Sequence, residues 1–232
     1  MAIKNLIQTS VGRKYISALT GLALVFFVIV HLLGNLTLFL PGGEAFNLYA
    51  EKLDALGPLK YLAEIGLVAF FGAHAIQGMR LALQNRAARG AVGYRGQKSK
   101  GHPSRWNLSS VRMPITGAVI LAFVVLHLIH FRFGPAQAQG YVVSADGKEI
   151  RDLYRLVVEV FSKPVAVGVY VLAAALMGMH LRHGIWSALQ SLGQMNRRAT
   201  WTVYTLGAAL AAALALGFIA LPVYLYLTHA GA

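Results

Sequence analysis

The chain has 232 residues, of which 57% are hydrophobic and only 12% are charged, a composition too apolar for a water-soluble domain. It has no cysteine, which excludes disulfides, thiolate chemistry and iron–sulfur ligation within this chain. Its formal net charge of +13 does not indicate nucleic-acid binding, because the cations cluster beside apolar runs, where they more often set membrane topology.

Five apolar runs are long enough to cross about 30 Å of hydrocarbon as helices. They cover about 16–40, 59–83, 113–133, 165–189 and 203–227. Prolines stand mostly at the edges of these runs, as expected for a residue without a backbone N–H; Pro222 lies inside the fifth run, which we expect it to kink. The predicted fold class is all-α: a single transmembrane domain over 1–232, built as an integral membrane bundle of five transmembrane helices.

The charges divide unequally between the two sides of this predicted bundle. The side that carries the N-terminus has fourteen cations and no acid, whereas the other side has seven cations and all eight acids. The positive-inside rule therefore predicts a cytoplasmic N-terminus and an outer C-terminus.

Two connections are longer than a link between helices needs. The cytoplasmic segment 84–111 is rich in glycine and cations, and two interpretations stay open: a topogenic loop on anionic lipid, or a docking surface for a cytoplasmic partner. In the outer segment 134–152, Tyr141-Val142-Val143 is followed by Asp146-Gly147-Lys148, which indicates a small turn or hairpin.

Two sequence frames each occur twice. The first is Thr-Gly, nine apolar residues and His-Leu, at 20–32 and again at 116–128. The second is a histidine with glycine two residues before and four residues after it, at His74 and at His180. The frames predict a parallel internal repeat of two helices, which relates the first two spans to the third and fourth and leaves the fifth outside.

The repeated histidines fall at two depths. Counted from the cytoplasmic ends of their spans, His31 and His127 lie about 22 and about 21 Å deep. Counted in the same way, His74 and His180 lie within about 10 Å of the inner edge. A pseudo-two-fold axis along the membrane normal would bring the two histidines of each depth face to face.

Ionisable groups inside a membrane are costly and are functional candidates by default. The alternative, that these histidines only pack, gives no reason for matched depths. Di-iron and di-manganese sites need carboxylates, and Glu64 is the only acid near a span, while zinc and copper sites need more or other ligands. A haem iron needs only two axial ligands, so the pattern predicts two bis-histidine haems, held by His31 with His127 and by His74 with His180.

Two further histidines, His130 and His183, follow His127 and His180 by three residues, and either could be the true ligand. We favour His127 and His180 because the repeated frames include them. His130, His183 and Arg182 are then candidate donors to haem propionates or to a quinone oxygen. The alternative is that they are interfacial residues facing water.

Several motifs together resemble one known family. They are Ser10-Val11-Gly12-Arg13-Lys14, Ala18-Leu19-Thr20-Gly21-Leu22, His31, Gly34, Asn35, the loop Phe46-Asn47-Leu48-Tyr49-Ala50, His74, Thr116-Gly117, His127, and His180-Leu181-Arg182-His183-Gly184 running on to Ser187, Gln190 and Gly193. With these residues the chain resembles the cytochrome b membrane anchor of succinate dehydrogenase and fumarate reductase (complex II), the single-anchor type with five helices and two b haems.

The resemblance implies a distal haem on His31 and His127 and a proximal haem on His74 and His180. It also implies cytoplasmic iron–sulfur and flavoprotein partners that hold the dicarboxylate site, a place in the plasma (inner) membrane of a prokaryote, and a role in the tricarboxylic acid cycle. One position departs from the family: some fumarate-reducing relatives carry a proton-conducting glutamate where this chain has Gly178. We therefore do not expect that proton path here.

The predicted function is electron relay from the iron–sulfur partner to a membrane quinone, menaquinone or ubiquinone, with no catalytic residue in this chain. The candidate quinone contacts are Arg13, Ser17, Arg182 and Gln190. One alternative is a dihaem cytochrome b anchor of another quinone-linked enzyme, of the formate dehydrogenase or hydrogenase type. A transporter or channel with a histidine proton relay is the alternative from a different class, and it would lack haem absorption bands.

Overall fold

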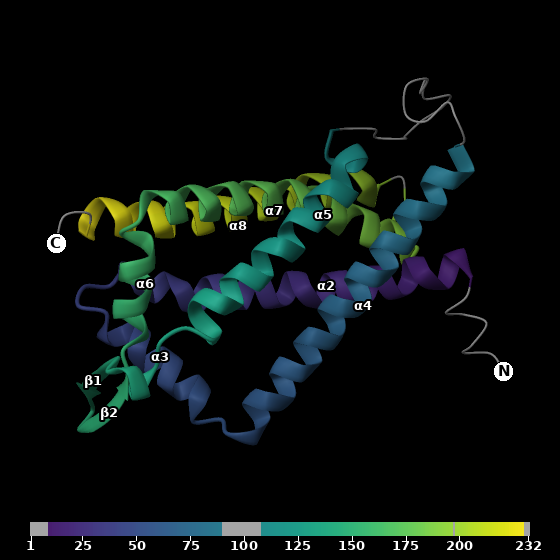
Figure 1. Cartoon of the computed structure of the whole chain (residues 1–232). Helices are drawn as coiled ribbons and strands as arrows, with labels where there is room; N and C mark the ends of the chain where they lie inside the picture. Colours follow the sequence, from purple (N-terminus) through teal and green to yellow (C-terminus); the bar gives the residue numbers. More distant parts are fainter. Residues whose placement is uncertain (1–8, 90–107, 197, 230–232) are drawn as a thin grey trace.

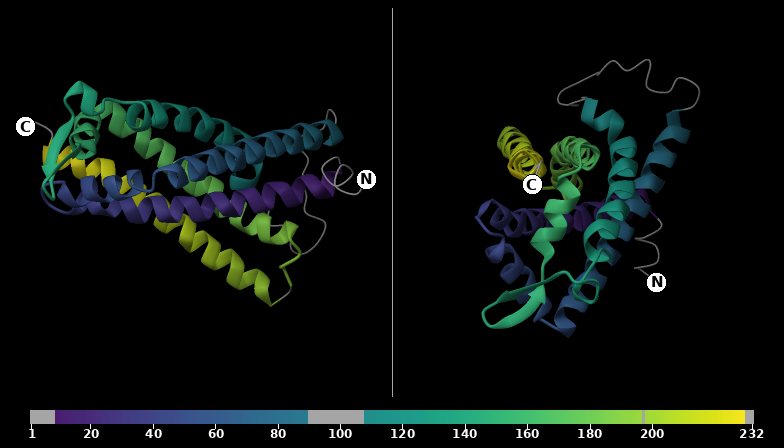
Figure 2. Two further views of the ribbon diagram at one scale, coloured as in Figure 1. Left: turned by 90° about the horizontal axis from the view of Figure 1, so that it is seen from below. Right: turned by 60° about the vertical axis from the view of Figure 1, so that its left-hand side comes forward.

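The computed structural model describes residues 9–89, 108–196 and 198–229. Five long helices dominate this part of the chain: α2 (Ser10–Asn35), α4 (Pro58–Arg89), α5 (Leu108–His127), α7 (Pro164–Ser191) and α8 (Ala199–His229). Each contains a stretch long and apolar enough to cross a membrane. They run lengthwise between the same two ends of the molecule and cross one another at an angle (Figure 1; Figure 2, left). The all-α class and the five-helix membrane bundle are therefore confirmed.

Local sequence explains where several of these helices begin and end. The Thr9 hydroxyl caps α2 by accepting a hydrogen bond from the Gly12 N–H at 3.0 Å. Pro164 occupies the first turn of α7, where its missing N–H costs nothing. α2 passes into the short 3-10 helix η1 (Leu36–Phe39), and α5 passes into the π-helical turn η3 (Leu128–Arg132). α8 continues through Pro222, and the kink there stays a prediction.

Smaller elements gather at one end of the bundle (Figure 1). They are α3 (Glu44–Asp54), the 3-10 turn η4 (Gln137–Gln139), the strands β1 (Val142–Ala145) and β2 (Lys148–Arg151), and α6 (Leu153–Phe161). Following the predicted orientation, we call this the outer end, and the end with Ser10 and Ser191 the inner end. The strands pair antiparallel around Asp146 and Gly147, whose φ angles of 50° and 72° suit a two-residue hairpin turn. The hairpin expected within 134–152 is confirmed.

Two expectations about loops were wrong. The motif Phe46-Asn47-Leu48-Tyr49-Ala50 lies in α3, which forms because Phe46 packs into the outer apolar core with Val157 and Leu225. The predicted loop 84–111 is helical at both edges, since α4 runs on to Arg89 through good helix formers and α5 begins at Leu108. The rest of that segment, 90–107, lies outside the described residues.

Four helices surround the histidines. α2 packs against α4 and α7, and α5 packs mainly against α7. α2 and α5 therefore face each other across the bundle, and so do α4 and α7. α8 lies outside this group, against α7 along its length and against α2; Figure 1 shows α7 and α8 side by side. The repeat thus supplies the four-helix unit, and the fifth span covers one side of it.

Candidate cofactor site

The outer histidine pair joins α2 to α5. The ring centroids of His31 and His127 lie 5.7 Å apart, with an interplanar angle of 89°. Phe27 and Phe218 stack on the His31 ring at centroid distances of 5.3 and 5.8 Å. Phe131 meets the His127 ring edge-on at 5.3 Å. The outer pair therefore sits in an aromatic, apolar surrounding.

The inner pair joins α4 to α7. The ring centroids of His74 and His180 lie 6.2 Å apart, with an interplanar angle of 75°. The structure thus brings together the same two pairs that depth indicated in the sequence. Their role as haem ligands stays a prediction.

Hydrogen bonds orient both rings of the inner pair. His74 Nδ1 lies 3.0 Å from the Ser17 carbonyl oxygen, an acceptor, so Nδ1 carries the proton and donates it. His180 Nδ1 lies 3.1 Å from Thr116 Oγ1. Because the Thr116 hydroxyl donates to carbonyls of its own helix, it accepts from His180. Both rings then carry a free lone pair on Nε2, the arrangement of a metal-binding imidazole oriented by a second partner.

The glycines of the two Thr-Gly frames touch these same rings. A Cβ on Gly21 would lie 3.0 Å from His74 Cε1, and one on Gly117 would lie 3.4 Å from His180 Cε1. Each frame therefore carries one outer histidine and, ten residues earlier, the small residue against which the inner histidine packs. Sequence reasoning noticed the repeat of Thr-Gly but missed this contact.

The outer pair is less completely bonded. His127 Nδ1 is buried and has no hydrogen-bond partner. His31 Nδ1 lies 3.5 Å from Asn35 Nδ2, at the limit of a hydrogen bond, and that amide donates at 2.7 Å to the His31 carbonyl. A buried nitrogen without a partner is costly, so the protein alone leaves this level unsatisfied.

The donor set fits haem better than a bare metal ion. In the described part of the chain, no three or more His, Cys, Asp or Glu side chains gather closely enough to hold an ion. A haem iron brings four equatorial nitrogens, so two imidazoles complete it. A Cβ added at Gly78 or Gly184, each four residues after an inner histidine and on the same helix face, would meet nothing within 4 Å, which leaves room for a flat macrocycle beside the inner pair.

His130 and His183, which follow His127 and His180 by three residues, have different surroundings. His130 lies on the π-helical turn after His127, and its Nδ1 is 2.9 Å from the Tyr170 hydroxyl, with the two rings stacked. Tyr170 is buried on α7 and was missed by sequence reasoning, because it looks like any other apolar position there. His183 lies next to Trp186, with ring centroids 6.3 Å apart.

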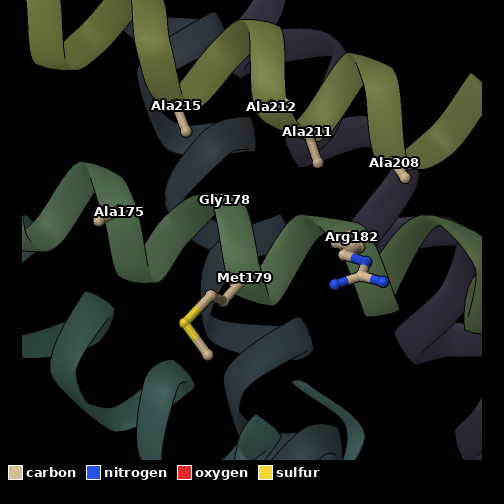
Figure 3. A pocket seen from close by; sticks show the side chains of 8 residues that line it. All are labelled: Ala175, Gly178, Met179, Arg182, Ala208, Ala211, Ala212 and Ala215. Atoms are coloured by element: carbon tan, nitrogen blue, oxygen red, sulfur yellow. The ribbon is translucent and has the colours of Figure 1, made fainter. Parts of the chain in front are cut away.

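Arg182 faces α8 rather than either histidine pair. It donates to the Tyr204 hydroxyl at 3.0 Å. It also lines a groove of about 290 Å³ between α7 and α8 (Figure 3). The other residues of the groove are mostly small: Ala175, Gly178, Met179, Ala208, Ala211, Ala212 and Ala215.

Gly178 allows α7 and α8 to approach in this groove. An added Cβ there would lie 2.7 Å from Ala215 Cβ, so a glutamate would push the helices apart. The absence of that glutamate from the sequence therefore agrees with the packing of the fifth span.

The other candidate contacts lie at the inner end. Ser17 acts through its carbonyl on His74, and Gln190 is exposed in the last turn of α7. Arg13 is half-buried, with its Nε buried and without a partner. Two atoms that sequence reasoning missed share this state, Gln77 Oε1 and Trp186 Nε1.

One known protein is similar to this chain over most of its length. The succinate dehydrogenase cytochrome b558 subunit of Bacillus subtilis (strain 168) is 26% identical over 176 residues, which cover 75% of this chain and 76% of the relative. No family model matches the chain, and no solved structure matches it. The similarity supports, at the level of the family, the resemblance to the cytochrome b anchors of complex II.

Proposed function

We propose that this relative of the succinate dehydrogenase cytochrome b subunit is a dihaem membrane anchor of a succinate:quinone oxidoreductase, which relays electrons from an iron–sulfur subunit to membrane quinone. The observation that carries the proposal is that two pairs of histidines face each other at two depths of one helical bundle. The ring centroids lie 5.7 Å apart in the outer pair and 6.2 Å apart in the inner pair. Two levels of two histidines match two bis-histidine irons.

The residues of this chain hold and orient the cofactors. A b haem at each level would supply reversible one-electron exchange. The Ser17 carbonyl and the Thr116 hydroxyl fix the rings of the inner pair and raise their basicity as ligands. At the outer level, Phe27 and Phe218 hold the His31 ring and exclude water from it.

The order of the two levels gives the relay a direction in space. With the inner end in the cytoplasm, the inner pair lies nearer to a cytoplasmic iron–sulfur subunit and its flavoprotein, and the outer pair lies deeper in the membrane. The quinone, menaquinone or ubiquinone, is drawn from the lipid around a multi-pass chain in the prokaryotic plasma membrane. This chain supplies the path, and the dicarboxylate chemistry belongs to the flavoprotein.

Purification in mild detergent tests the proposal. We expect the chain to carry b-type bands in a reduced-minus-oxidised visible spectrum, with two haems per chain, and to bring a flavoprotein and an iron–sulfur protein with it. Succinate should then reduce the haems. A purified chain without haem bands would favour a histidine-relay transporter, and a formate dehydrogenase or hydrogenase subunit in the complex would favour the related anchors.

A further inference from the structure

We propose that the inner end of the bundle contains a carboxylate-binding site, formed by Arg13, Gln77 and Trp186, that binds the propionate groups of the inner haem. The inference rests on the proposed function, since it needs a haem on His74 and His180. It moves Arg13 from the candidate quinone contacts to the haem, and it adds Gln77 and Trp186, which were not among the site residues predicted from the sequence.

Three polar atoms at this end are buried without a partner. They are Arg13 Nε, Gln77 Oε1 and Trp186 Nε1. Gln77 has only 7% of its surface exposed, and its Oε1 atom has neither solvent nor a hydrogen-bond partner within the protein. Buried polar groups in proteins are nearly always satisfied, and several unsatisfied ones near one cofactor level point to a ligand that satisfies them.

These residues lie at similar depths, just inward of the inner pair. Gln77 follows His74 by three residues, which is about 4.5 Å along α4, and Trp186 follows His180 by six, about 9 Å along α7. Arg13 precedes Ser17, whose carbonyl bonds His74, by four residues, about 6 Å along α2.

Helical periodicity also places Arg13 toward the inside of the bundle. It precedes His31 by eighteen residues, which is five turns, so the two side chains leave the same face of α2. The His31 ring meets His127 of α5 across the bundle, and Arg13 shares that direction at the inner end.

The repeat adds a fourth donor. Gln77 and His183 hold equivalent places, each three residues after an inner histidine and each followed by glycine. His183 also neighbours Trp186, with ring centroids 6.3 Å apart. Each half of the repeat thus supplies one hydrogen-bonding side chain a turn inward of its haem-binding candidate.

Charge identifies a carboxylate as the ligand. All eight acids of the chain fall between 44 and 64 or between 146 and 159, which lie at the outer end, so no acid of this chain pairs with Arg13. A guanidinium and an indole N–H only donate, and the Gln77 amide donates once its two ends are exchanged, a flip that leaves its shape unchanged. A half-buried cation whose Nε is shut off from solvent, together with such donors, favours an anion over a neutral quinone carbonyl.

Potentiometric titration of the intact complex tests this site. Arg13→Gln removes a positive charge beside the inner haem, so its reduced-to-oxidised ratio at a fixed potential should fall on the order of tenfold, while the outer haem stays unchanged. Lys14→Gln is the matched control, because it removes the same charge from an exposed neighbouring position, and it should change the ratio less than about twofold. If Arg13→Gln leaves the reduced-to-oxidised ratio of the inner haem unchanged while both haems stay bound, the carboxylate site is wrong, but the proposed function is not affected.

A second variant tests whether the acceptor oxygen at this site belongs to a haem propionate or to a quinone. Trp186→Phe keeps an aromatic ring and removes the N–H that would bond a propionate. With haem labelled with carbon-13 at its propionates, the carboxylate band in redox-difference infrared spectra should therefore shift relative to the wild type. The same shift should be seen after quinone is extracted. A raised quinone KM in Trp186→Phe and Arg13→Gln, with potentials and the labelled band unchanged, would instead assign the residues to quinone. Absence of haem from the wild-type chain would contradict the proposed function itself.

Discussion

The inner and outer histidine pairs have similar ring spacing but are held differently. At the inner level, both Nδ1 atoms have partners, the Ser17 carbonyl and the Thr116 hydroxyl, and a glycine packs against each ring. At the outer level, His127 Nδ1 has no partner and His31 is held chiefly by stacked aromatic rings. Hydrogen bonds therefore set the geometry of the inner pair before a cofactor binds, whereas the outer pair depends on packing.

The two ends of the bundle also differ, in the opposite sense. At the outer end, Arg151 donates to carbonyls of Phe131, Gly134 and Pro135, and the Asn47 amide bonds Asp152. At the inner end, buried donors stay unpaired. Hydrogen bonds within the chain join the elements of the outer end, whereas the inner end keeps unpaired donors where we propose the carboxylate-binding site.

The largest expected effect at the outer level comes from Gly34→Ala. A Cβ there would overlap the ring of Tyr49, which holds α3 against α2 one turn beyond His31. We expect a loss of about 1–3 kcal/mol in unfolding free energy, with the outer haem released first. Gly168→Ala is the control, since a Cβ there meets nothing within 4 Å. Thermal unfolding followed in the haem band measures both, and equal stability of the two variants would contradict the packing described.

At the inner level, Gly21→Ala should act more strongly than Gly117→Ala. The added Cβ would lie 3.0 Å from the His74 ring in the first case and 3.4 Å from the His180 ring in the second, where contact is ordinary. We expect Gly21→Ala to tilt His74 and to shift the low-spin electron paramagnetic resonance signal of the inner haem only. Equal shifts in both variants, or a shift of the outer signal, would show that these glycines do not position the rings.

A smaller effect should follow from Thr116→Val. The variant removes the acceptor for His180 Nδ1, which weakens the imidazole as a donor to iron and should raise the inner potential, with a few-fold higher reduced-to-oxidised ratio. Thr228→Val is the matched control, because the Thr228 hydroxyl donates to the carbonyls of Tyr224 and Leu225 in its own helix, near the outer end of α8. The control should leave both potentials unchanged. A similar rise in both variants would trace the effect to helix distortion.

The smallest expected effect is on the outer surface and depends on pH. Hydrogen bonds from Tyr141 and from Arg155 lower the pKa of Glu159 below its ordinary value of 4.5. Such a carboxylate stabilises the fold above its unfolded pKa, and the contribution is lost as the pH falls through the lowered, folded pKa. The protection of hairpin amides against hydrogen exchange, measured relative to the intrinsic exchange rate at each pH, should therefore fall below about pH 4.5 in the wild type. In Tyr141→Phe this acid-induced change should be smaller, and an identical pH profile would count against the contact.

The sequence was sufficient for the spans and for the histidine pairs because both follow from periodicity. Span length follows from apolar runs, and depth along a helix follows from residue number. The helices α3 and α6 were missed because each is short and acquires its stability from the outer apolar core, to which they contribute Phe46 and Phe161. No local pattern marks such a tertiary contact.

The polar contacts of the site were harder to foresee. Tyr170, Gln77 and Trp186 stand in apolar helices, and their significance depends on which neighbouring helix each side chain meets. Arg182 shows the reverse, since its place beside His180 in the sequence suggested the haem, yet its guanidinium turns to Tyr204 of α8. One residue along a helix rotates the side chain by about 100°, which is enough to change the partner.

The central claim is that each level holds one haem between its own two histidines. Electron paramagnetic resonance with potentiometric titration of single alanine variants tests this claim most directly. Variants of His31 and His127 should lose the same low-spin haem, and variants of His74 and His180 should lose the other. His130→Ala and His183→Ala should keep both haems low-spin. Loss of a low-spin haem in either of these, with retention in the variant of the histidine three residues before it, would contradict the account.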